Sequence, residues 1–315
     1  MPPRRIIILN SHANNGQARK KWKAVAPVVM ARLSSKGGKP PEVVDSPVNG
    51  LTEMVGHFAK DGQCTIIAAG GDGTVSHCAN AILAQPEADK DRFVLGAIGL
   101  GSSNDFHKPF ERDKCLGRVP VRIDDHRPIK HNAGLVIYDA GEEKRRRFFV
   151  VNASMGVVAE GNLLFNKGDA MIRRLKPLCV SAAINYTAIK AIGMHKNIEA
   201  AITVANEQHP VKMTNLGVVI NPHFTGSCRY DTPVSPQSDH MCVNLLENLN
   251  RRQLLGAFYY FGKGRFLGRP GARSWRVEKA SAIPAGLAAL EIDGEVETTT
   301  AAHFILIKEA LSVCQ

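Results

Sequence analysis

The segment Gly70–Thr74 holds three glycines, an aspartate and a threonine between an apolar run and an amphipathic stretch. Glycine lets the backbone approach a ligand closely and adopt a positive φ without a Cβ clash. Thr74 is expected to cap the following helix, whose first N–H groups favour an anion. Asp72 would repel a phosphate directly, so it implies Mg²⁺ or a bridging water. The segment predicts a phosphate-binding loop, and the alternative is a structural strand-to-helix turn.

A second polar loop, Gly99–Phe106, follows the next apolar run. It has Asn104 where the dinucleotide-binding fingerprint needs a third glycine, and it lacks the Gly-Lys-Ser/Thr of a Walker A loop. Consecutive strand ends are usually neighbours in a parallel sheet, so this loop should lie beside the first. Asp105 would then stand near Asp72 and form a pair of carboxylates suited to Mg²⁺. A structural loop capped by its own Asn or Asp is an equal alternative.

Two further segments carry polar residues where apolar runs end. Residues 10–16 follow the first run, and Asn14 and Gly16 both tolerate left-handed backbone. Residues 291–295 contain an Asp-Gly pair between acidic residues, which is most typical of a β-hairpin. Neither segment predicts a function when taken alone.

The first hundred residues supply the elements that must position these loops. Apolar runs predict strands at 6–9, 42–44, 64–69 and 93–98, and helical spacing of apolar residues predicts helices at 17–35, 52–60 and 74–84. Pro27 should kink or split the first of these helices. Strands and helices in this alternation indicate a parallel sheet covered on both faces, with the polar loops at its carboxyl edge.

The pattern changes after about residue 130. Short β-rich runs bounded by turn residues occur at 133–138, 147–152, 199–204, 213–220, 241–245, 274–279 and 288–292. Helical stretches interrupt them at 170–194 and at about 251–261. The second half is therefore expected to form a mostly antiparallel β domain.

Composition narrows the function classes. The 315 residues carry 40 Lys+Arg against 29 Asp+Glu, a formal charge of +11, which favours anionic partners. The seven cysteines never stand in a C-x-x-C pair, which argues against a zinc ribbon or a disulfide framework and fits a reducing cytoplasm. No run approaches the roughly 20 apolar residues of a membrane span. We recognise no nucleic-acid-binding module, so nucleic acid is not an expected partner.

Together the motifs resemble the diacylglycerol kinase catalytic-domain family, which includes bacterial lipid kinases, sphingosine kinases and ceramide kinases. The family carries Asn-Pro-x-x-Gly-x-Gly, Gly-Gly-Asp-Gly-Thr, Gly-Thr-x-Asn-Asp-Phe and Asp-Gly-Glu. These motifs correspond here to residues 10–16, 70–74, 101–106 and 293–295. The Gly-Gly-Asp-Gly-Thr loop is shared with NAD kinases and phosphofructokinases, whereas Asn-Asp-Phe and Asp-Gly-Glu select the lipid-kinase branch.

The resemblance implies a fold of two domains. The first is a Rossmann-like α/β nucleotide-binding domain with a parallel sheet, similar to that of phosphofructokinase and NAD kinase, formed by residues 1–132 with a C-terminal return at 293–315. The second is an antiparallel β-sandwich at 133–292, which would take the lipid substrate.

The resemblance also implies ATP and Mg²⁺ as cofactors and assigns roles to individual residues. Glu295 matches the general base that takes the proton from the lipid hydroxyl, and Asp72 is the second catalytic residue. The positions that match nucleotide-binding residues are Asn10, Gly16, Ser46, Gly70, Gly71, Asp72, Gly73, Thr74, Ser102 and Asn104.

Two metal positions follow from the same resemblance. Asp72 and Asp105 match an acidic network that organises Mg²⁺, although Asn132 stands where the family often has a third aspartate. Asp239 matches the side-chain ligand of a structural Mg²⁺, and the carbonyls near Pro236 and Met241 would complete that site. His240 replaces the glycine that usually follows this aspartate.

The implied activity is that of a transferase of phospholipid metabolism, a kinase acting on diacylglycerol or a related lipid alcohol such as ceramide or a sphingoid base. Such an enzyme would be cytoplasmic and would meet its substrate at a membrane surface, where the basic clusters at 19–23, 145–147, 173–176 and 263–273 could dock. Two alternatives stay open: a kinase of a soluble substrate, as NAD kinase is, and a non-catalytic regulator that binds nucleotide or lipid. The sequence also leaves a homodimer open.

Overall fold

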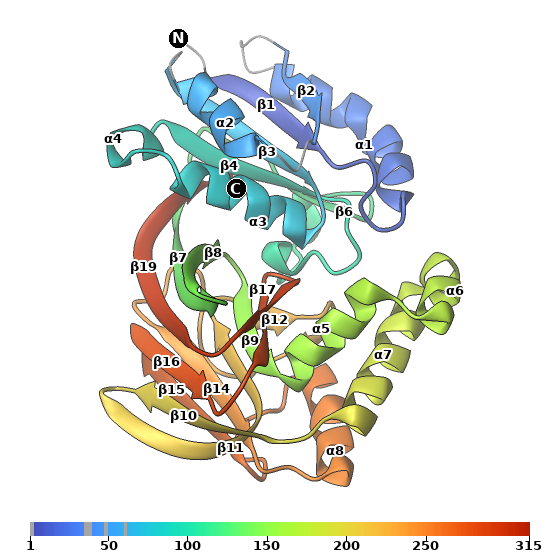
Figure 1. The fold of residues 1–315 in the computed structure, drawn as a ribbon. Helices are drawn as coiled ribbons and strands as arrows, with labels where there is room; N and C mark the ends of the chain where they lie inside the picture. The colour runs from blue at the N-terminus through green and yellow to red at the C-terminus, as the bar shows by residue number, and fades with distance from the viewer. Residues whose placement is uncertain (1–2, 35–39, 47–49, 60–61) are drawn as a thin grey trace. The chain divides into compact units, whose positions relative to one another are not determined.

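The computed structural model describes residues 3–34, 40–46, 50–59 and 62–315 (Figure 1). The chain divides into two compact units, which we call the first unit (residues 1–132 with 308–315) and the second unit (residues 133–307). The resemblance implies domains at 1–132 with 293–315 and at 133–292. In the structure, residues 295–299 and 302–305 pair with strands of the second unit, and the C-terminal part of the first unit begins at Lys308.

The first unit is built on a parallel sheet in the order β2 (Glu42–Asp45), β1 (Arg4–Leu9), β3 (Cys64–Gly70) and β4 (Phe93–Gly99). Beyond β4, the same edge pairs with the antiparallel strand β6 (Val119–Arg122) and with the last residues of β19 (Ala302–Val313). Strands β1, β3 and β4 are nearly continuous apolar runs because both faces of the sheet are covered there. The predicted parallel α/β architecture is therefore confirmed.

Helices cover the two faces of this sheet. From α1 (Gln17–Ser34), Val25 and Val29 pack with Ile7 and Ile67 on one face. Neighbouring strand residues alternate to the opposite face, where α2 (Leu51–Ala59) and α3 (Asp72–Leu83) lie (Figure 1). The short elements of this unit are α4 (Glu87–Lys90), the 3-10 helices η1 (Asp105–His107) and η2 (Arg112–Lys114), and β5 (Cys115–Leu116).

Two predicted helices differ in detail from the structure. α1 runs unbroken through Pro27, because burial of Val25 and Val29 on either side of the proline holds the helix on the sheet. α3 begins at Asp72 rather than at Thr74, since β3 ends at Gly70 and the chain turns directly into the helix. The predicted last residues of the first two helices, Ser35 and Lys60, lie outside the described residues.

The second unit is antiparallel and β-rich, as expected. Its main strands are β7 (Ile129–Ala140, which begins in the first unit), β8 (Glu143–Phe149), β9 (Asn152–Gly156), β10 (Ile198–Val204), β11 (Glu207–Val219), β14 (Met241–Glu247), β15 (Ala272–Val277), β16 (Lys279–Pro284), β17 (Ala288–Ile292) and β18 (Glu295–Thr299), together with the first part of β19. Pairing runs without interruption from β8 through β7, β19, β16, β10, β11, β9 and β17 to β18. These strands enclose one buried apolar core, to which Phe149, Met213 and Phe304 contribute.

Four helices accompany these strands: α5 (Val157–Lys167), α6 (Ala170–Leu178), α7 (Val180–Met194) and α8 (Arg251–Gly262). The stretch predicted as one helix at 170–194 is divided at Cys179, whose extended backbone separates α6 from α7. A small hairpin of β12 (His223–Phe224) and β13 (Cys228–Arg229) completes the unit. Among the described residues, no helix combines the length and apolar character needed to cross a bilayer.

Candidate functional site

Three polar loops of the first unit meet at the carboxyl edge of its parallel sheet. The amide of Asn10, just after β1, donates to Oγ1 of Thr74 over 3.2 Å. The backbone N–H groups of Leu100 and Gly101, just after β4, donate to the carbonyl of Gly70 over 2.7 and 3.1 Å. The expected proximity of the loops that follow β1, β3 and β4 is therefore observed.

Close contacts explain two glycines of these loops, Gly70 and Gly101, but not Gly73. A Cβ on Gly101 would stand 2.5 Å from the Cα of Gly71, and a Cβ on Gly70 would stand 2.2 Å from Oγ1 of Thr74. By contrast, a Cβ on Gly73 would meet no described atom within 4 Å. Packing inside the protein therefore explains Gly70 and Gly101, whereas Gly73 borders open space in which a ligand could lie.

The N-terminus of α3 lies among these loops. We call the loops after β1, β3 and β4, together with the start of α3, the phosphate cradle. Its N-cap residue is Gly71, and within the described residues no side-chain hydrogen bond caps it. Thr74 lies in the first turn and is buried against Asn10, so the predicted capping role of Thr74 is wrong. An uncapped start of a twelve-residue helix presents N–H groups and a partial positive charge, the combination that binds a phosphate.

The loop after β4 is shaped by its own side chains. Asn104 adopts a left-handed conformation with φ 51°. Its Oδ1 accepts from the N–H of Gly101 over 3.0 Å, and its Nδ2 donates to the carbonyl of Gly99 over 3.2 Å. These bonds give Asn104 a role in holding the loop. Ser102 is exposed at the tip of the loop, where a hydroxyl can reach a ligand.

The two acidic residues of the predicted magnesium network have different surroundings. Oδ1 of Asp72 accepts from the N–H of Phe106 over 3.0 Å, so this carboxylate joins the two loops. Oδ1 of Asp105 is paired with Nζ of Lys108 at 2.7 Å, and both side chains are buried. Mg²⁺ usually binds one or two carboxylates together with the phosphates of its nucleotide. Asp72 fits that role, whereas the charge of Asp105 is already balanced by Lys108.

The remaining predicted nucleotide residues, Gly16 and Ser46, follow β1 and β2. The loop after β1 turns through left-handed residues, with φ 52° at Asn14 and 80° at Gly16. The N–H of Ser46 donates to the carbonyl of Leu9 over 2.8 Å, which fixes the end of β2 beside β1.

Oδ1 of Asn132 accepts from the N–H of Glu309 over 2.9 Å, so this side chain supports the returning strand β19.

Sequence reasoning missed Lys21 of α1. Its Nζ donates to the carbonyls of Leu100 and Gly101 over 3.2 and 2.7 Å, and these bonds attach the loop after β4 to α1. Burial lowers the pKa of Lys21, although both hydrogen bonds require a donor at that position. A lysine within a strongly basic helix gives no sequence signal of this contact, so only the structure reveals it.

The Asp-Gly-Glu motif of the second unit forms the tight turn between β17 and β18. Asp293 is buried in a left-handed conformation with φ 49°. Its carboxylate accepts from the backbone N–H groups of Val150, Val151 and Asn152 over 2.8, 2.9 and 3.2 Å. Asp293 therefore fastens the turn to the connection between β8 and β9, and its side chain serves the structure of the turn.

Glu295, the proposed base, follows this turn and is paired with Arg147 of β8. Nη1 of Arg147 donates to Oε2 of Glu295 over 2.6 Å. Burial disfavours the charged form of Arg147, but the hydrogen bond and the charge of Glu295 outweigh it, and the pKa of Arg147 is raised. A carboxylate beside a permanent cation stays ionised, as a base must.

The turn predicted to hold a structural Mg²⁺ is closed by the ring of His240. Its Nδ1 lies 2.6 Å from Oδ1 of Asp239, and its Nε2 lies 3.1 Å from the carbonyl of Pro233. Both ring nitrogens of His240 therefore lie within hydrogen-bond distance of an oxygen of this turn. The metal site of Asp239 with the carbonyls of Pro236 and Met241 stays a prediction, and no mechanistic step rests on it.

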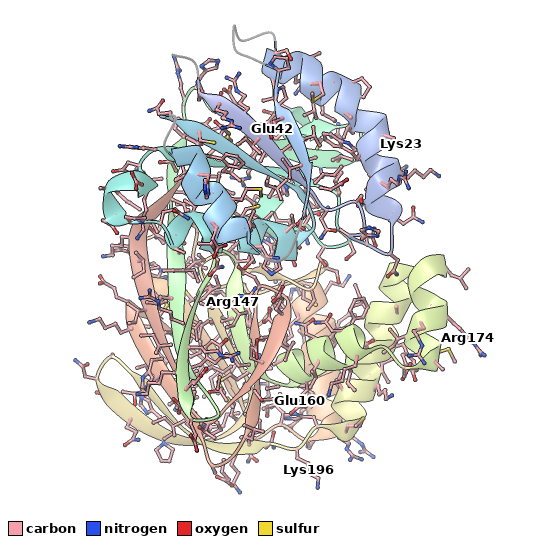
Figure 2. All side chains as sticks on the ribbon, turned by 45° about the horizontal axis from the view of Figure 1, so that its top comes forward. Lys23, Glu42, Arg147, Glu160, Arg174 and Lys196 are labelled. Atoms are coloured by element: carbon pink, nitrogen blue, oxygen red, sulfur yellow. The ribbon has the colours of Figure 1, made fainter. Side chains whose placement is uncertain are left out.

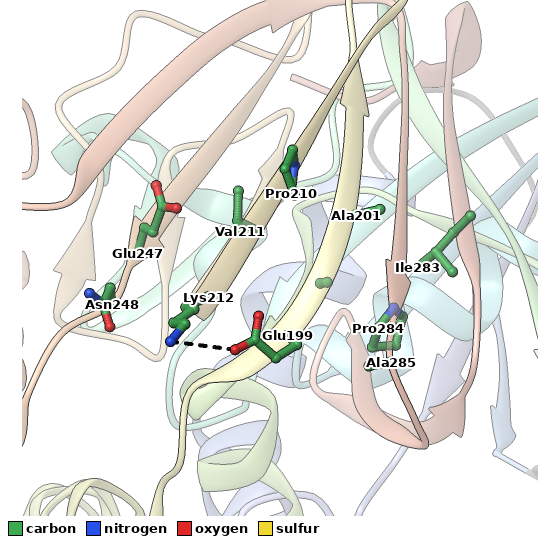
Figure 3. Close-up of a pocket in the computed structure, with 11 residues that line it drawn as sticks. Glu199, Ala201, Pro210, Val211, Lys212, Glu247, Asn248, Ile283, Pro284 and Ala285 are labelled. Carbon is green, nitrogen blue, oxygen red and sulfur yellow. Dashed lines mark ion pairs between the residues drawn. The ribbon is translucent and has the colours of Figure 1, made fainter.

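The second unit also has an open groove of about 580 Å³ over β10, β11 and β16 (Figure 3). Ala201, Val211 and Ile283 line it, and an ion pair between Lys212 and Glu199 at 3.6 Å lies at one end. None of the predicted site residues lines this groove, so we keep it separate from the candidate site.

Comparison with known proteins agrees with the motifs. Residues 4–128 match the family model of the diacylglycerol kinase catalytic domain. A diacylglycerol kinase of Staphylococcus haemolyticus is 23% identical over 297 residues, which cover 93% of this chain and 83% of that protein. A Yersinia enterocolitica protein named "Probable lipid kinase YegS-like" is 33% identical over 92 residues, which cover 29% of this chain and 28% of that protein.

Solved structures share the fold. One crystal structure from Bacillus anthracis str. Sterne superposes with a TM-score of 0.69 and 16% identity, over 99% of this chain and 94% of that chain. A second from the same organism, described as a diacylglycerol kinase, gives a TM-score of 0.64 and 13% identity, over 99% and 96% of the two chains. At these identities the likeness concerns the fold.

Proposed function

We propose that this chain, whose residues 4–128 match the family model of the diacylglycerol kinase catalytic domain, is an ATP- and Mg²⁺-dependent lipid kinase. The acceptor would be the hydroxyl of diacylglycerol or of a related lipid alcohol. The observation that carries the proposal is the uncapped N-terminus of α3 among three glycine-containing loops. Phosphoryl transfer asks a protein mainly to position a triphosphate and to balance its charge, and this cradle is suited to both tasks.

Residues of the first unit would bind the nucleotide. Backbone N–H groups at the start of α3 would bind phosphate oxygens, and Gly73 would leave room for them. Lys21 and Asn104 would keep the second loop in place, and Asp72 would hold the cation. When bound, Mg²⁺ supplies charge neutralisation on the phosphates. The proposal needs no further metal.

Glu295 would act as the general base. A lipid hydroxyl is a weak acid, so a carboxylate that accepts its proton during the attack on the γ-phosphate contributes about 10²–10⁴-fold to the rate. The Arg147 partner supports this role, because an ionised carboxylate with a fixed orientation is ready to accept a proton. Asp293 is unsuited to it, since three backbone N–H groups already occupy its carboxylate.

Helices α6 and α7 would contact the membrane peripherally. They carry exposed apolar side chains at Met171, Leu178, Ile189 and Met194, of which Leu178 is 83% exposed. Two exposed arginines, Arg173 and Arg174, stand on α6, and Figure 2 shows Arg174 pointing outward from that helix. Apolar side chains beside cations suit an anionic lipid surface. Sedimentation with phosphatidylglycerol vesicles should drop strongly in a variant with Arg173→Glu and Arg174→Glu.

A substrate panel tests the proposed function directly. The purified chain is incubated with ATP, Mg²⁺ and, in separate reactions, diacylglycerol, ceramide, sphingosine and NAD⁺, and products are identified by mass spectrometry. We expect a phosphorylated lipid and no phosphorylated NAD⁺. Phosphorylation of NAD⁺ alone would make the protein a kinase of a soluble substrate. No turnover with any acceptor would favour a binding protein without catalysis.

A further inference from the structure

Strand β8 carries four consecutive cations, and one of them differs from the rest. Lys144, Arg145 and Arg146 are exposed, whereas the side chain of Arg147 is only 16% exposed. Arg147 belongs to the second unit. A guanidinium that loses most of its hydration needs a partner that compensates for the loss. Nη1 of Arg147 donates a hydrogen bond to Glu295.

The backbone segments that carry Arg147 and Glu295 are joined by hydrogen bonds of Asp293. Asp293, two residues before Glu295, accepts N–H groups from Val150 and Val151, three and four residues after Arg147. The amide of Asn166 in α5 also donates to the carbonyl of Gly294 over 3.1 Å, which braces the turn from the other side. The backbones that carry the guanidinium and the carboxylate are therefore fastened to each other. The 2.6 Å contact is made between residues that have little freedom to move apart.

The charges around the pair favour an ionised carboxylate at position 295. The acidic groups that face Arg147 are Glu295 and Asp293, and the phenol of Tyr138 faces it from β7. Asp293 is committed to backbone N–H groups, which leaves Glu295 as the hydrogen-bonded partner. Glu297 and Arg145 act on Tyr138, and burial together with Glu297 raises the pKa of that phenol, so Tyr138 adds no negative charge near neutral pH.

We propose that Arg147 is the positioning residue of the catalytic carboxylate: it orients Glu295 through Oε2 and keeps it ionised until the acceptor hydroxyl gives up its proton. This inference rests on the proposed function. In the transfer step the hydroxyl oxygen bonds to the γ-phosphorus, the bond from that phosphorus to ADP breaks, and the hydroxyl proton passes to Glu295. Arg147 cannot take this proton, because a guanidinium stays protonated throughout the working pH range.

The first test needs no substrate. The carboxyl carbon of Glu295 is followed by ¹³C NMR during a pH titration, with its signal identified by its loss in Glu295→Gln. We expect Arg147→Gln to raise the apparent pKa of Glu295 by about one unit, since an opposite charge at this distance lowers a carboxyl pKa by roughly one to three units. The control is Arg146→Gln, on the opposite face of the same strand, which should leave the titration unchanged. An unmoved titration in Arg147→Gln would overturn the inference.

The second test measures lipid phosphorylation against pH. Arg147→Gln should shift the acid limb of kcat to higher pH and lower its plateau about tenfold, while KM for ATP changes less than twofold. Arg147→Lys keeps a cation and should restore most of the plateau, which also guards against a folding defect in the first variant. In a Glu295→Gln background, Arg147→Gln should cause no further loss. A full tenfold loss in that background would show that Arg147 acts elsewhere.

The two tests separate this inference from the proposed function. If the Glu295 titration moves in Arg147→Gln but no lipid is phosphorylated by the unsubstituted chain, the ion pair is supported and the lipid-kinase proposal fails. If lipid is phosphorylated but neither the titration nor the acid limb moves, the kinase proposal holds and the role of Arg147 is refuted.

Discussion

Gly101 approaches Gly71 so closely that a Cβ on Gly101 would stand 2.5 Å from the Cα of Gly71. The loops after β3 and β4 therefore fit together only while position 101 has no side chain. We expect Gly101→Ala to push the loops apart, at a cost of about 1–3 kcal/mol in the free energy of unfolding. ATP affinity, measured by calorimetry, should fall at least tenfold, because the phosphate cradle loses its shape.

The matched control is Gly256→Ala in α8, where a Cβ would meet no described atom within 4 Å. This variant should bind ATP as the unsubstituted chain does. If Gly101→Ala also kept full ATP affinity, the contact between the two loops would have no part in nucleotide binding.

Gly73→Ala tests whether the space beside Gly73 serves ATP binding or the packing of the protein. A Cβ there meets no described atom within 4 Å, and alanine is the better helix former by up to about 1 kcal/mol. The free energy of unfolding should therefore stay unchanged or rise slightly, while ATP affinity falls at least tenfold. Chemical denaturation and calorimetry on the same sample measure both. Undiminished ATP binding would mean that the open space beside Gly73 receives no phosphate.

Lys21→Met tests the support beneath the second loop. The variant removes two hydrogen bonds to the carbonyls of Leu100 and Gly101 but keeps a side chain of similar length. We expect a loss of about 1–2 kcal/mol in the free energy of unfolding, together with weaker ATP binding. Lys20→Met, at an exposed neighbouring position, should change stability by less than about 0.5 kcal/mol. Equal effects of the two variants would contradict the role given to Lys21.

Most of the first unit could be predicted from its sequence because its central strands β3 and β4 are buried apolar runs. A buried parallel strand such as Cys64–Gly70 is a continuous apolar run, so the local sequence is enough to predict it. The end of each strand then gives the position of the loop that follows. The errors concern the effect of Pro27 within α1 and the start of α3. The sequence predicts Thr74 as the N-cap, but α3 begins two residues earlier, at Asp72. The hydroxyl oxygen of Thr74 instead accepts a hydrogen bond from the amide of Asn10.

The partners of charged side chains could not be predicted. Arg147 and Glu295 are 148 residues apart, so no local motif contains both. Their pairing depends on how β8 and the turn before β18 meet. The same holds for Lys108, which follows Asp105 by three residues but pairs with it only because η1 turns the chain there. His240 similarly binds Asp239 and Pro233, which the Asp-His sequence alone does not indicate.

Two buried histidines of the first unit should make the fold sensitive to acid. Burial, together with the nearby charge of Arg122, lowers the pKa of His107 and of His131 to about 3. Their Nε2 atoms have no hydrogen-bond partner among the described residues. The unfolded chain binds protons on both rings below about pH 6.5, while the folded chain does not. The free energy of unfolding should therefore fall between pH 7 and pH 5, by up to about 2 kcal/mol for each histidine.

Urea unfolding at the two pH values measures this loss. A variant with His107→Gln and His131→Gln cannot take up these protons, so its stability should depend less on pH. The control is His126→Gln, at an exposed position, which should keep the full dependence. The same loss of stability in the double variant would show that other groups cause the acid sensitivity.

The most direct measurement compares the unsubstituted chain with Glu295→Gln in the transfer of phosphate from ATP to lipid, with ATP affinity measured in parallel. Loss of the base should lower turnover by about 10²-fold or more, while the nucleotide site in the first unit binds ATP as before. Equal turnover in the two proteins would contradict the assignment of Glu295 as the base, and with it the mechanism proposed for this kinase.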